Sequence, residues 1–289
     1  MAANAFEVWY FPGWMRANEP QDGVLPALAT CFPESKIVFK AWDGDRVWPK
    51  ATENADLAAE RFADEITALD CAERSNLVLV GHSLGGRIAA RVSRRLGDRG
   101  LKVRETVLLG AAIPYRDADV EASGLGSELP VMAICNPQDV TLRYVYTVLG
   151  GENSPAFGAN GALKRLENVR EYVVPSTIVA ETPIDRTWAD IQAVKEICNH
   201  HALFYLECLR RIVGGEAMDE GVMVPQDFIT VELPVMDLGV WWDVIDEYDG
   251  WKLERNKLTG HARILDPDKI RKAWGSLAVL TPAFEKIKR

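Results

Sequence analysis

The chain has 289 residues, of which 48% are hydrophobic and 26% charged, and its formal net charge is −9. This composition is typical of a globular protein with one large α/β domain plus additions, or with two small domains. An acidic chain is poorly suited to nucleic acid or anionic membrane surfaces, so we expect neither as a main partner. No apolar run approaches the length of a membrane span, so we expect no transmembrane segment.

The cysteines and the N-terminal residues bear on the cellular compartment of the protein. Five cysteines occur, an odd number without Cys-x-x-Cys spacing. The start, MAANAFEVWYFPGW, lacks the basic and apolar regions of a secretory signal. We therefore expect free thiols and a cytoplasmic protein. We expect no cofactor and no metal, because the sequence has no Gly-x-Gly-x-x-Gly motif, P-loop or Cys/His ligand spacing.

Apolar runs and helical patterns alternate through the first three quarters of the chain. The runs typical of buried strands cover 6–13, 36–42, 76–82, 105–113, 129–136 and 170–175. Helical patterns cover 23–31, 51–70, 85–98, 140–149, 187–198 and 200–213. Strand–helix alternation predicts right-handed crossovers, and hence a three-layer α/β/α fold with a mostly parallel central sheet.

The end of the chain differs in composition from the rest. Gly214 and Gly215 fit the end of the last core helix. Four of the nine tryptophans follow, and the stretch GWKLERNKLTGHARIL has the pattern of a hairpin with its turn near NKLTG. We therefore expect a core at 1–215 and a Trp-rich accessory element at 216–289 that packs on the core.

The segment Gly81-His82-Ser83-Leu84-Gly85 fits the pattern Gly-x-Ser-x-Gly. It lies between an apolar strand and an amphipathic helix, the context in which this pattern marks a nucleophilic serine. A sharp strand-to-helix turn lifts the Ser83 hydroxyl above the sheet, and the glycines leave room for the neighbouring backbone. The alternative is a glycine-rich turn whose serine only caps the helix.

The stretch VLVGHSLGGRIAARV resembles the nucleophile segment of the α/β-hydrolase superfamily, particularly its lipase-like and esterase-like members. The resemblance spans about residues 6–213. It implies an acid after a later strand, followed by a histidine. Asp139 fits the acid, since it follows the apolar run of 129–136. A turn aspartate that caps a helix is the alternative for Asp139, and Asp117 and Asp119 are substitutes for the acid.

Three histidines follow Asp139, and the resemblance places the catalytic one at a loop-to-helix entry. His200 and His201 lie at such an entry, after Asn199, a candidate N-cap. Adjacent residues point about 100° apart on a helix, so only one of them can serve as the base. We prefer His201, because Phe204 and Tyr205 follow it at the spacing typical of the family, and keep His200 as the alternative base. For the remaining histidines we expect a structural role (His82) and a solvated hairpin position (His261).

The stretch VWYFPGWM resembles the loop of the superfamily that supplies one backbone amide to the oxyanion hole, with Pro12 where a histidine is usual. The resemblance implies oxyanion donors at the Trp14 and Leu84 amides, with Gly13 allowing close approach. A plain Pro-Gly turn is the alternative.

We therefore predict a serine hydrolase that cleaves a carboxylic ester of a small-molecule substrate through Ser83, His201 and Asp139, by way of an acyl-enzyme. Thioesterase, amidase and acyltransferase chemistry would use the same residues. A non-catalytic binding or scaffold protein, with the Trp-rich end as its interface, is the alternative of a different class. The segment 176–196 is a candidate lid over the site.

Overall fold

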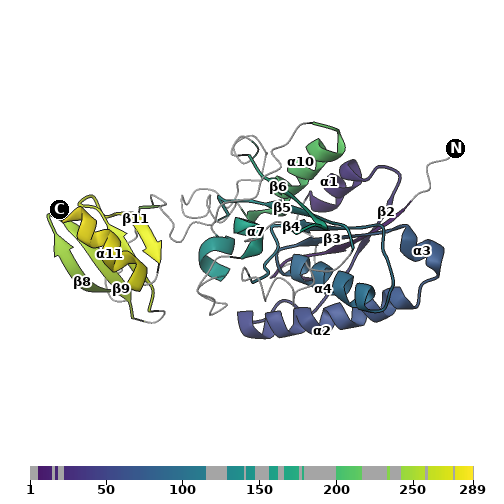
Figure 1. Ribbon diagram of the computed structural model, residues 1–289, viewed down its shortest axis with the longest axis horizontal. Helices are drawn as coiled ribbons and strands as arrows, with labels where there is room; N and C mark the ends of the chain where they lie inside the picture. Colours follow the sequence, from purple (N-terminus) through teal and green to yellow (C-terminus); the bar gives the residue numbers. More distant parts are fainter. Residues whose placement is uncertain are drawn as a thin grey trace. The chain divides into compact units, whose positions relative to one another are not determined.

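The computed structural model in Figure 1 describes residues 6–14, 17–18, 23–114, 129–139, 141–146, 156–161, 166–175, 178, 200–216, 233–234, 242–257, 260–275 and 277–288. The chain forms two compact units, Met1–Pro225 and Gln226–Arg289. The division expected after residue 215, and the packing of the second part on the first, stay predictions, because residues 217–232 lie outside these ranges.

The first unit is built on a six-stranded sheet in the order β2-β1-β3-β4-β5-β6, and every neighbouring pair is parallel. Strands β3, β4 and β5 lie in its middle and are almost wholly buried, which explains why their sequences are continuous apolar runs. All six expected strands are confirmed, with shorter ends. Their bounds are Glu7–Phe11 (β1), Lys36–Phe39 (β2), Leu77–His82 (β3), Glu105–Leu109 (β4), Val131–Cys135 (β5) and Val169–Val173 (β6).

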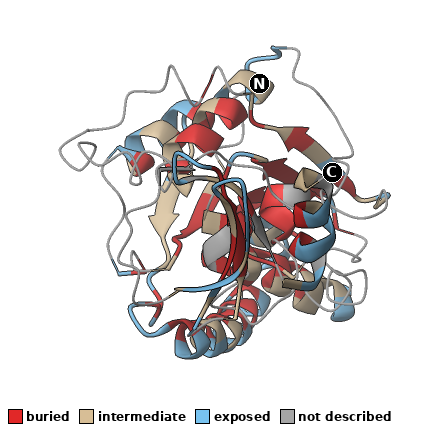
Figure 2. Ribbon diagram, turned by 90° about the vertical axis from the view of Figure 1, so that its left-hand side faces the viewer, coloured by how far each residue is buried: buried red, intermediate tan, exposed pale blue. Residues whose placement is uncertain are grey.

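Helices cover both faces of this sheet, and the expected three-layer α/β/α fold is confirmed (Figure 1). Helices α1 (Val24–Cys31) and α10 (Ala202–Val213) lie on one face, and α2 (Trp48–Thr67) and α4 (Leu84–Asp98) on the other. Each face has its own buried hydrophobic cluster. Figure 2 shows the buried strands between helices whose outer surfaces are exposed.

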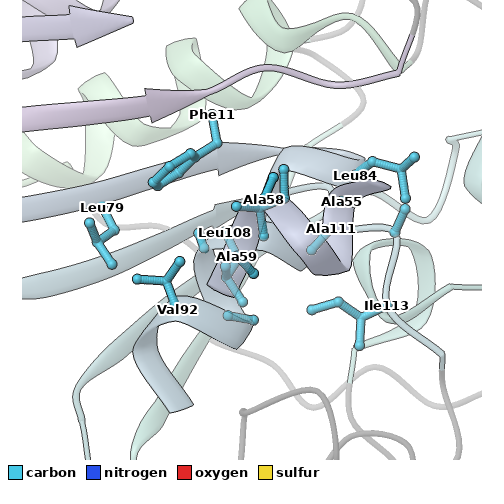
Figure 3. Packing of buried hydrophobic residues seen from close by; sticks show 14 of the residues in the cluster. Phe11, Ala55, Ala58, Ala59, Leu79, Leu84, Val92, Leu108, Ala111 and Ile113 are labelled. Carbon is cyan, nitrogen blue, oxygen red and sulfur yellow. The ribbon is translucent and has the colours of Figure 1, made fainter. Parts of the chain in front are cut away.

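The cluster between the sheet, α2 and α4 combines large and small side chains (Figure 3). Ala55 and Ala59 of α2 are fully buried in it, together with Phe11 and Val92. Alanines at these positions let α2 approach α4 closely, and this packing fixes the helix that follows Ser83.

The expected and observed elements differ at several ends. Helix α2 begins at Trp48 rather than at residue 51, because Pro49 lies in the first turn, where its missing N–H costs no helical hydrogen bond. Strand β4 ends at Leu109, since Gly110 takes a φ of 52° that an extended strand does not accommodate. The short helices α3 (Cys71–Ser75) and α7 (Phe157–Asn160) were not expected from the sequence.

Two expected helices remain partly or wholly untested. In the range 140–149, residues Thr141–Val145 form a π-helical segment, η1. Residues 187–198 and the candidate lid at 176–196, apart from residue 178, lie outside the described ranges.

The second unit contains an antiparallel sheet in the order β7-β11-β10-β9-β8. The expected hairpin is confirmed as β9 (Trp251–Asn256) and β10 (Ala262–Leu265). Leu253 and Ile264 from this hairpin form a buried cluster with Leu280 and Phe284 of α11. The remaining bounds are Leu233–Pro234 (β7), Trp242–Tyr248 (β8), Ile270–Gly275 (β11) and Leu277–Ile287 (α11).

Among the helices of the described residues, none is both long enough and apolar enough to cross a membrane.

Candidate active site

Ser83 joins β3 to α4 with φ 56° and ψ −121°. A positive φ is costly for a residue with a side chain, so the surrounding structure must hold it in place. Two backbone hydrogen bonds do so, because the Ser83 amide donates to the Leu109 carbonyl (3.1 Å) and the Ser83 carbonyl accepts from the Ala112 amide (2.9 Å). The expected strained turn between strand and helix is therefore present.

The glycines around Ser83 are required by close backbone contacts. A Cβ on Gly81 would lie 2.2 Å from the Gly85 carbonyl oxygen, and a Cβ on Gly85 would lie 2.0 Å from the Phe11 carbonyl oxygen. At both positions only backbone could move to make room. The sequence pattern Gly-x-Ser-x-Gly thus reflects the packing of α4 against β1 and β3.

The structure brings His200, Ser83 and Asp139 together. His200 Nε2 lies 2.8 Å from Ser83 Oγ, and His200 Nδ1 lies 2.5 Å from Asp139 Oδ2. Asp139 is fully buried, and Ser83 is 5% exposed. A hydroxyl, an imidazole and a carboxylate in this order form the arrangement that activates a serine as a nucleophile.

The expectation that His201 faces Ser83 is wrong. His201 is the N-cap of α10, and its Nδ1 accepts a hydrogen bond from the Leu203 amide (3.2 Å). The helix begins at Ala202, two residues later than expected, so His200 precedes it and turns toward Ser83. The candidate N-cap Asn199 lies outside the described residues.

Asp139 lies where the sequence predicts the acid, in the loop after β5, and three donors hold its carboxylate. Oδ1 accepts from the Leu142 amide (2.8 Å), while Oδ2 accepts from the Tyr205 hydroxyl as well as from His200. Burial and then the charge of Asp139 raise the pKa of Tyr205 well above its usual value, so the phenol keeps the proton that it donates. The substitutes Asp117 and Asp119 lie outside the described ranges.

The sequence did not reveal the contact of Tyr205 with Asp139. The signal that the sequence offers is the aromatic pair Phe204 and Tyr205 after the histidines, and that pair favours His201 as the base. Tyr205 comes from the first turn of α10 and is fully buried, and its ring fills the space over Gly110, where a Cβ would lie 2.4 Å from the ring.

A small pocket of about 50 Å³ opens at Ser83. Gly13 approaches the serine closely, as expected, since a Cβ there would lie 3.0 Å from Ser83 Cβ. Trp14 also lines the pocket, and its ring is held by a hydrogen bond from Nε1 to the Arg46 carbonyl (2.7 Å) and by an edge contact with Trp48. The described lining residues are Tyr10, Pro12, Gly13, Trp14, His82, Ser83 and His200.

The two expected oxyanion donors both adjoin Ser83. Leu84 is the first residue of α4, and the first amides of a helix have no acceptor within it. The loop of Trp14 is anchored by the Trp42 indole, which donates to the Pro12 carbonyl (2.9 Å). That these two amides donate to an oxyanion stays a prediction.

Other sequence candidates lie elsewhere. His261 belongs to the β9–β10 hairpin of the second unit and is half-buried rather than solvated. Within the described ranges, no group of three or more His, Cys, Asp or Glu side chains could hold a metal ion.

Residues 28–142 match the model of the thioesterase domain family. The matched segment contains Ser83 and Asp139 and ends before His200. No curated protein matches the chain.

Several solved structures are similar to the chain. One is the RedJ thioesterase of the prodiginine biosynthetic pathway in Streptomyces coelicolor, at 17% identity, with 45% of this chain and 66% of that chain covered and a TM-score of 0.30. Another is an esterase of Pyrobaculum calidifontis, at 16% identity, 74% and 77% coverage and a TM-score of 0.38. A third is lipase B of Aspergillus fumigatus, at 11% identity, 78% and 67% coverage and a TM-score of 0.41. At such identities and TM-scores, these similarities do not bear on the substrate or the reaction.

Proposed function

We propose that this chain, a protein with the α/β-hydrolase fold, is a serine hydrolase that cleaves ester or thioester bonds through Ser83, His200 and Asp139. The observation that carries the proposal is the position of His200, whose two ring nitrogens lie 2.8 Å from Ser83 Oγ and 2.5 Å from Asp139 Oδ2. The strained backbone of Ser83 supports it, because a serine that only caps a helix needs no such conformation.

The proposed reaction has two halves. Ser83 Oγ attacks the substrate carbonyl carbon while its proton passes to His200 Nε2. The tetrahedral intermediate collapses, the bond to the leaving oxygen or sulfur breaks, and His200 returns the proton to the leaving alcohol or thiol. Water then attacks the carbonyl carbon of the acyl-Ser83 while one of its protons passes to His200 Nε2. The bond from the acyl carbon to Ser83 Oγ breaks, His200 returns the proton to Oγ, and the carboxylic acid is released.

Asp139 fixes the imidazole in the tautomer that this cycle needs. With the proton on Nδ1 held by Asp139 Oδ2, the lone pair of His200 Nε2 faces Ser83. The carboxylate also stabilises the imidazolium that forms during the attack.

The amides of Trp14 and Leu84 are the proposed donors to the oxyanion. The N-terminus of α4 adds positive potential at the same place, because the peptide dipoles of a helix point their positive end there.

Two substrate classes compete for this site. A carboxylic ester is the class expected from the sequence, on the resemblance to lipase-like and esterase-like proteins. The match of residues 28–142 to the thioesterase domain model favours a thioester as the second candidate. Amide hydrolysis and acyl transfer would use the same residues.

Matched substrates test the proposal. A p-nitrophenyl ester and an N-acetylcysteamine thioester with the same acyl group are offered to the purified protein, with short, medium and long acyl chains. We expect turnover of at least one class, lost by about 10⁴-fold or more in Ser83→Ala. The ratio of the two kcat/KM values assigns ester or thioester. Turnover that survives in Ser83→Ala, or its absence with both substrates at every chain length, contradicts the proposal and favours the binding or scaffold alternative.

A further inference from the structure

His82 precedes the nucleophile and contacts the base. It is 4% exposed, and its Nε2 lies 2.8 Å from the backbone carbonyl oxygen of His200. A carbonyl oxygen only accepts hydrogen bonds, so His82 Nε2 carries the proton and donates it. The side chain next to Ser83 thus holds the main chain of the residue that faces Ser83.

Ring contacts support the same placement. The His82 ring lies 4.8 Å from the ring of His200, with 36° between their planes, and 5.7 Å from the ring of Tyr205. Tyr205 in turn donates to the carboxylate of Asp139. His82 therefore contacts both the base and the residue that donates to the acid.

The base needs such a contact because the hydrogen bonds of α10 do not hold its backbone. Helix α10 begins at Ala202 with His201 as its N-cap, so His200 precedes the helix and lies outside the hydrogen bonds of α10. A shift of the His200 backbone displaces the His200 imidazole directly. Because the His200 ring must contact Ser83 Oγ and Asp139 Oδ2 at the same time, even a small shift lengthens one of the two contacts.

The charge state of His82 suits this position. Burial, and then the neighbouring His200 and His201, lower the pKa of His82 well below its ordinary value. A neutral His82 does not repel the imidazolium that forms on His200 during the proposed reaction.

We infer that His82 is a positioning residue, whose hydrogen bond to the His200 carbonyl sets the backbone so that the His200 imidazole reaches both Ser83 and Asp139. The inference rests on the proposed function. It also gives a physical reason why His200 rather than His201 faces the serine: a side chain of the turn Gly81-His82-Ser83-Leu84-Gly85, called the elbow below, donates to the His200 carbonyl.

Two variants separate the hydrogen bond from the volume of the side chain. His82→Phe keeps a ring but removes the donor, while His82→Gln keeps an N–H at about the reach of Nε2. We expect His82→Phe to lower kcat by about 10- to 100-fold with KM changed by less than about two-fold, since a displaced base weakens the chemical step rather than binding. His82→Gln restores most of the lost kcat. The matched control, His261→Phe in the second unit, leaves both constants unchanged.

Either of two results overturns the inference. One is a His82→Phe variant with the kcat of the wild type, and the other is an equal loss in His82→Phe and His82→Gln, which would assign the effect to packing. Thermal unfolding of each variant establishes that the folded fractions are the same.

A measurement on the wild-type protein covers the case in which a variant fails to fold. Nitrogen-15 NMR of labelled histidines reports the tautomer and charge of His82, and we expect the neutral Nε2–H form at pH 7. A neutral Nδ1–H tautomer contradicts the contact, because it leaves Nε2 no proton to donate to the His200 carbonyl. Because this readout needs no turnover, it separates a failure of the inference from a failure of the proposed hydrolase function.

Discussion

Two short segments meet at the candidate active site, and they are built differently. In the elbow, the two residues that must lack a side chain, Gly81 and Gly85, belong to one five-residue motif, although they contact the backbone of β1 as well as each other. In the histidine segment, His200 is set by distant contacts: Asp139 lies 61 residues earlier and His82 lies 118 residues earlier. The sequence requirement of the elbow is thus local, whereas the position of His200 depends on side-chain contacts with residues far away in the chain.

The largest expected effect is a loss of kcat when the long-range contact of His200 with Asp139 is removed. In Asp139→Asn, an amide replaces the carboxylate oxygen that accepts from His200 Nδ1, which favours the wrong tautomer of the imidazole. We expect kcat to fall by about 10⁴-fold with the fold intact. Steady-state kinetics with an activated ester measure it. Asp56→Asn, at a partly exposed carboxylate paired with Arg87 and Arg91, is the matched control and should change kcat by less than about two-fold. Equal kcat values in the two variants would show that Asp139 is not the acid that orients His200.

This dependence explains how much of the site could be predicted from the sequence. The six strands, Ser83 and the loop of Asp139 follow from local patterns, because strand burial and the elbow are local requirements. The choice between His200 and His201 depends on where α10 begins, and the contact of His201 with the Leu203 amide fixes that start. Two identical adjacent side chains carry no local signal of which one turns toward a residue elsewhere in the chain. The contact of Tyr205 with Asp139 is hidden for the same reason.

Gly85→Ala disrupts the packing of the elbow. The added Cβ would lie 2.0 Å from the Phe11 carbonyl oxygen, so α4 or β1 must move. We expect the free energy of unfolding to fall by about 3 kcal/mol or more, measured by urea unfolding. Gly100→Ala is the matched control, because Gly100 has a positive φ of 67° with nothing near its missing Cβ. Its cost should be about 1 kcal/mol, from backbone strain alone. A Gly85→Ala variant as stable as Gly100→Ala would show that the elbow is not tightly packed.

Tyr205→Phe tests how far the acid depends on α10. The variant keeps the ring over Gly110 and removes one of the three donors to Asp139. We expect kcat to fall by about 10-fold with little change in KM, since a loosened carboxylate orients His200 less well. Kinetics with the activated ester measure this, and Tyr248→Phe at the exposed edge strand β8 serves as the control. An unchanged kcat would mean that Leu142 and His200 hold Asp139 without the phenol.

His201→Ala has the smallest expected effect on activity, and it distinguishes a capping role of His201 from a role as the base. It removes the N-cap of α10, and we expect the free energy of unfolding to fall by about 1 kcal/mol while kcat changes by less than about three-fold. Thermal unfolding and kinetics measure the two quantities. His201→Ser, which restores a capping oxygen, should recover the stability. A loss of kcat that His201→Ser does not recover, in a folded protein, would return His201 to the candidates for the base.

The central claim is that His200 activates Ser83, and the rate of phosphonate labelling tests it most directly. The wild type, His200→Ala and His201→Ala are treated with a fluorophosphonate, and peptide mass spectrometry follows modification of Ser83. We expect Ser83 to be the labelled residue, with nearly equal rates in the wild type and His201→Ala and a rate lower by about 10³-fold or more in His200→Ala. An unlabelled Ser83 in the folded wild type, or fast labelling in His200→Ala and slow labelling in His201→Ala, would contradict the claim.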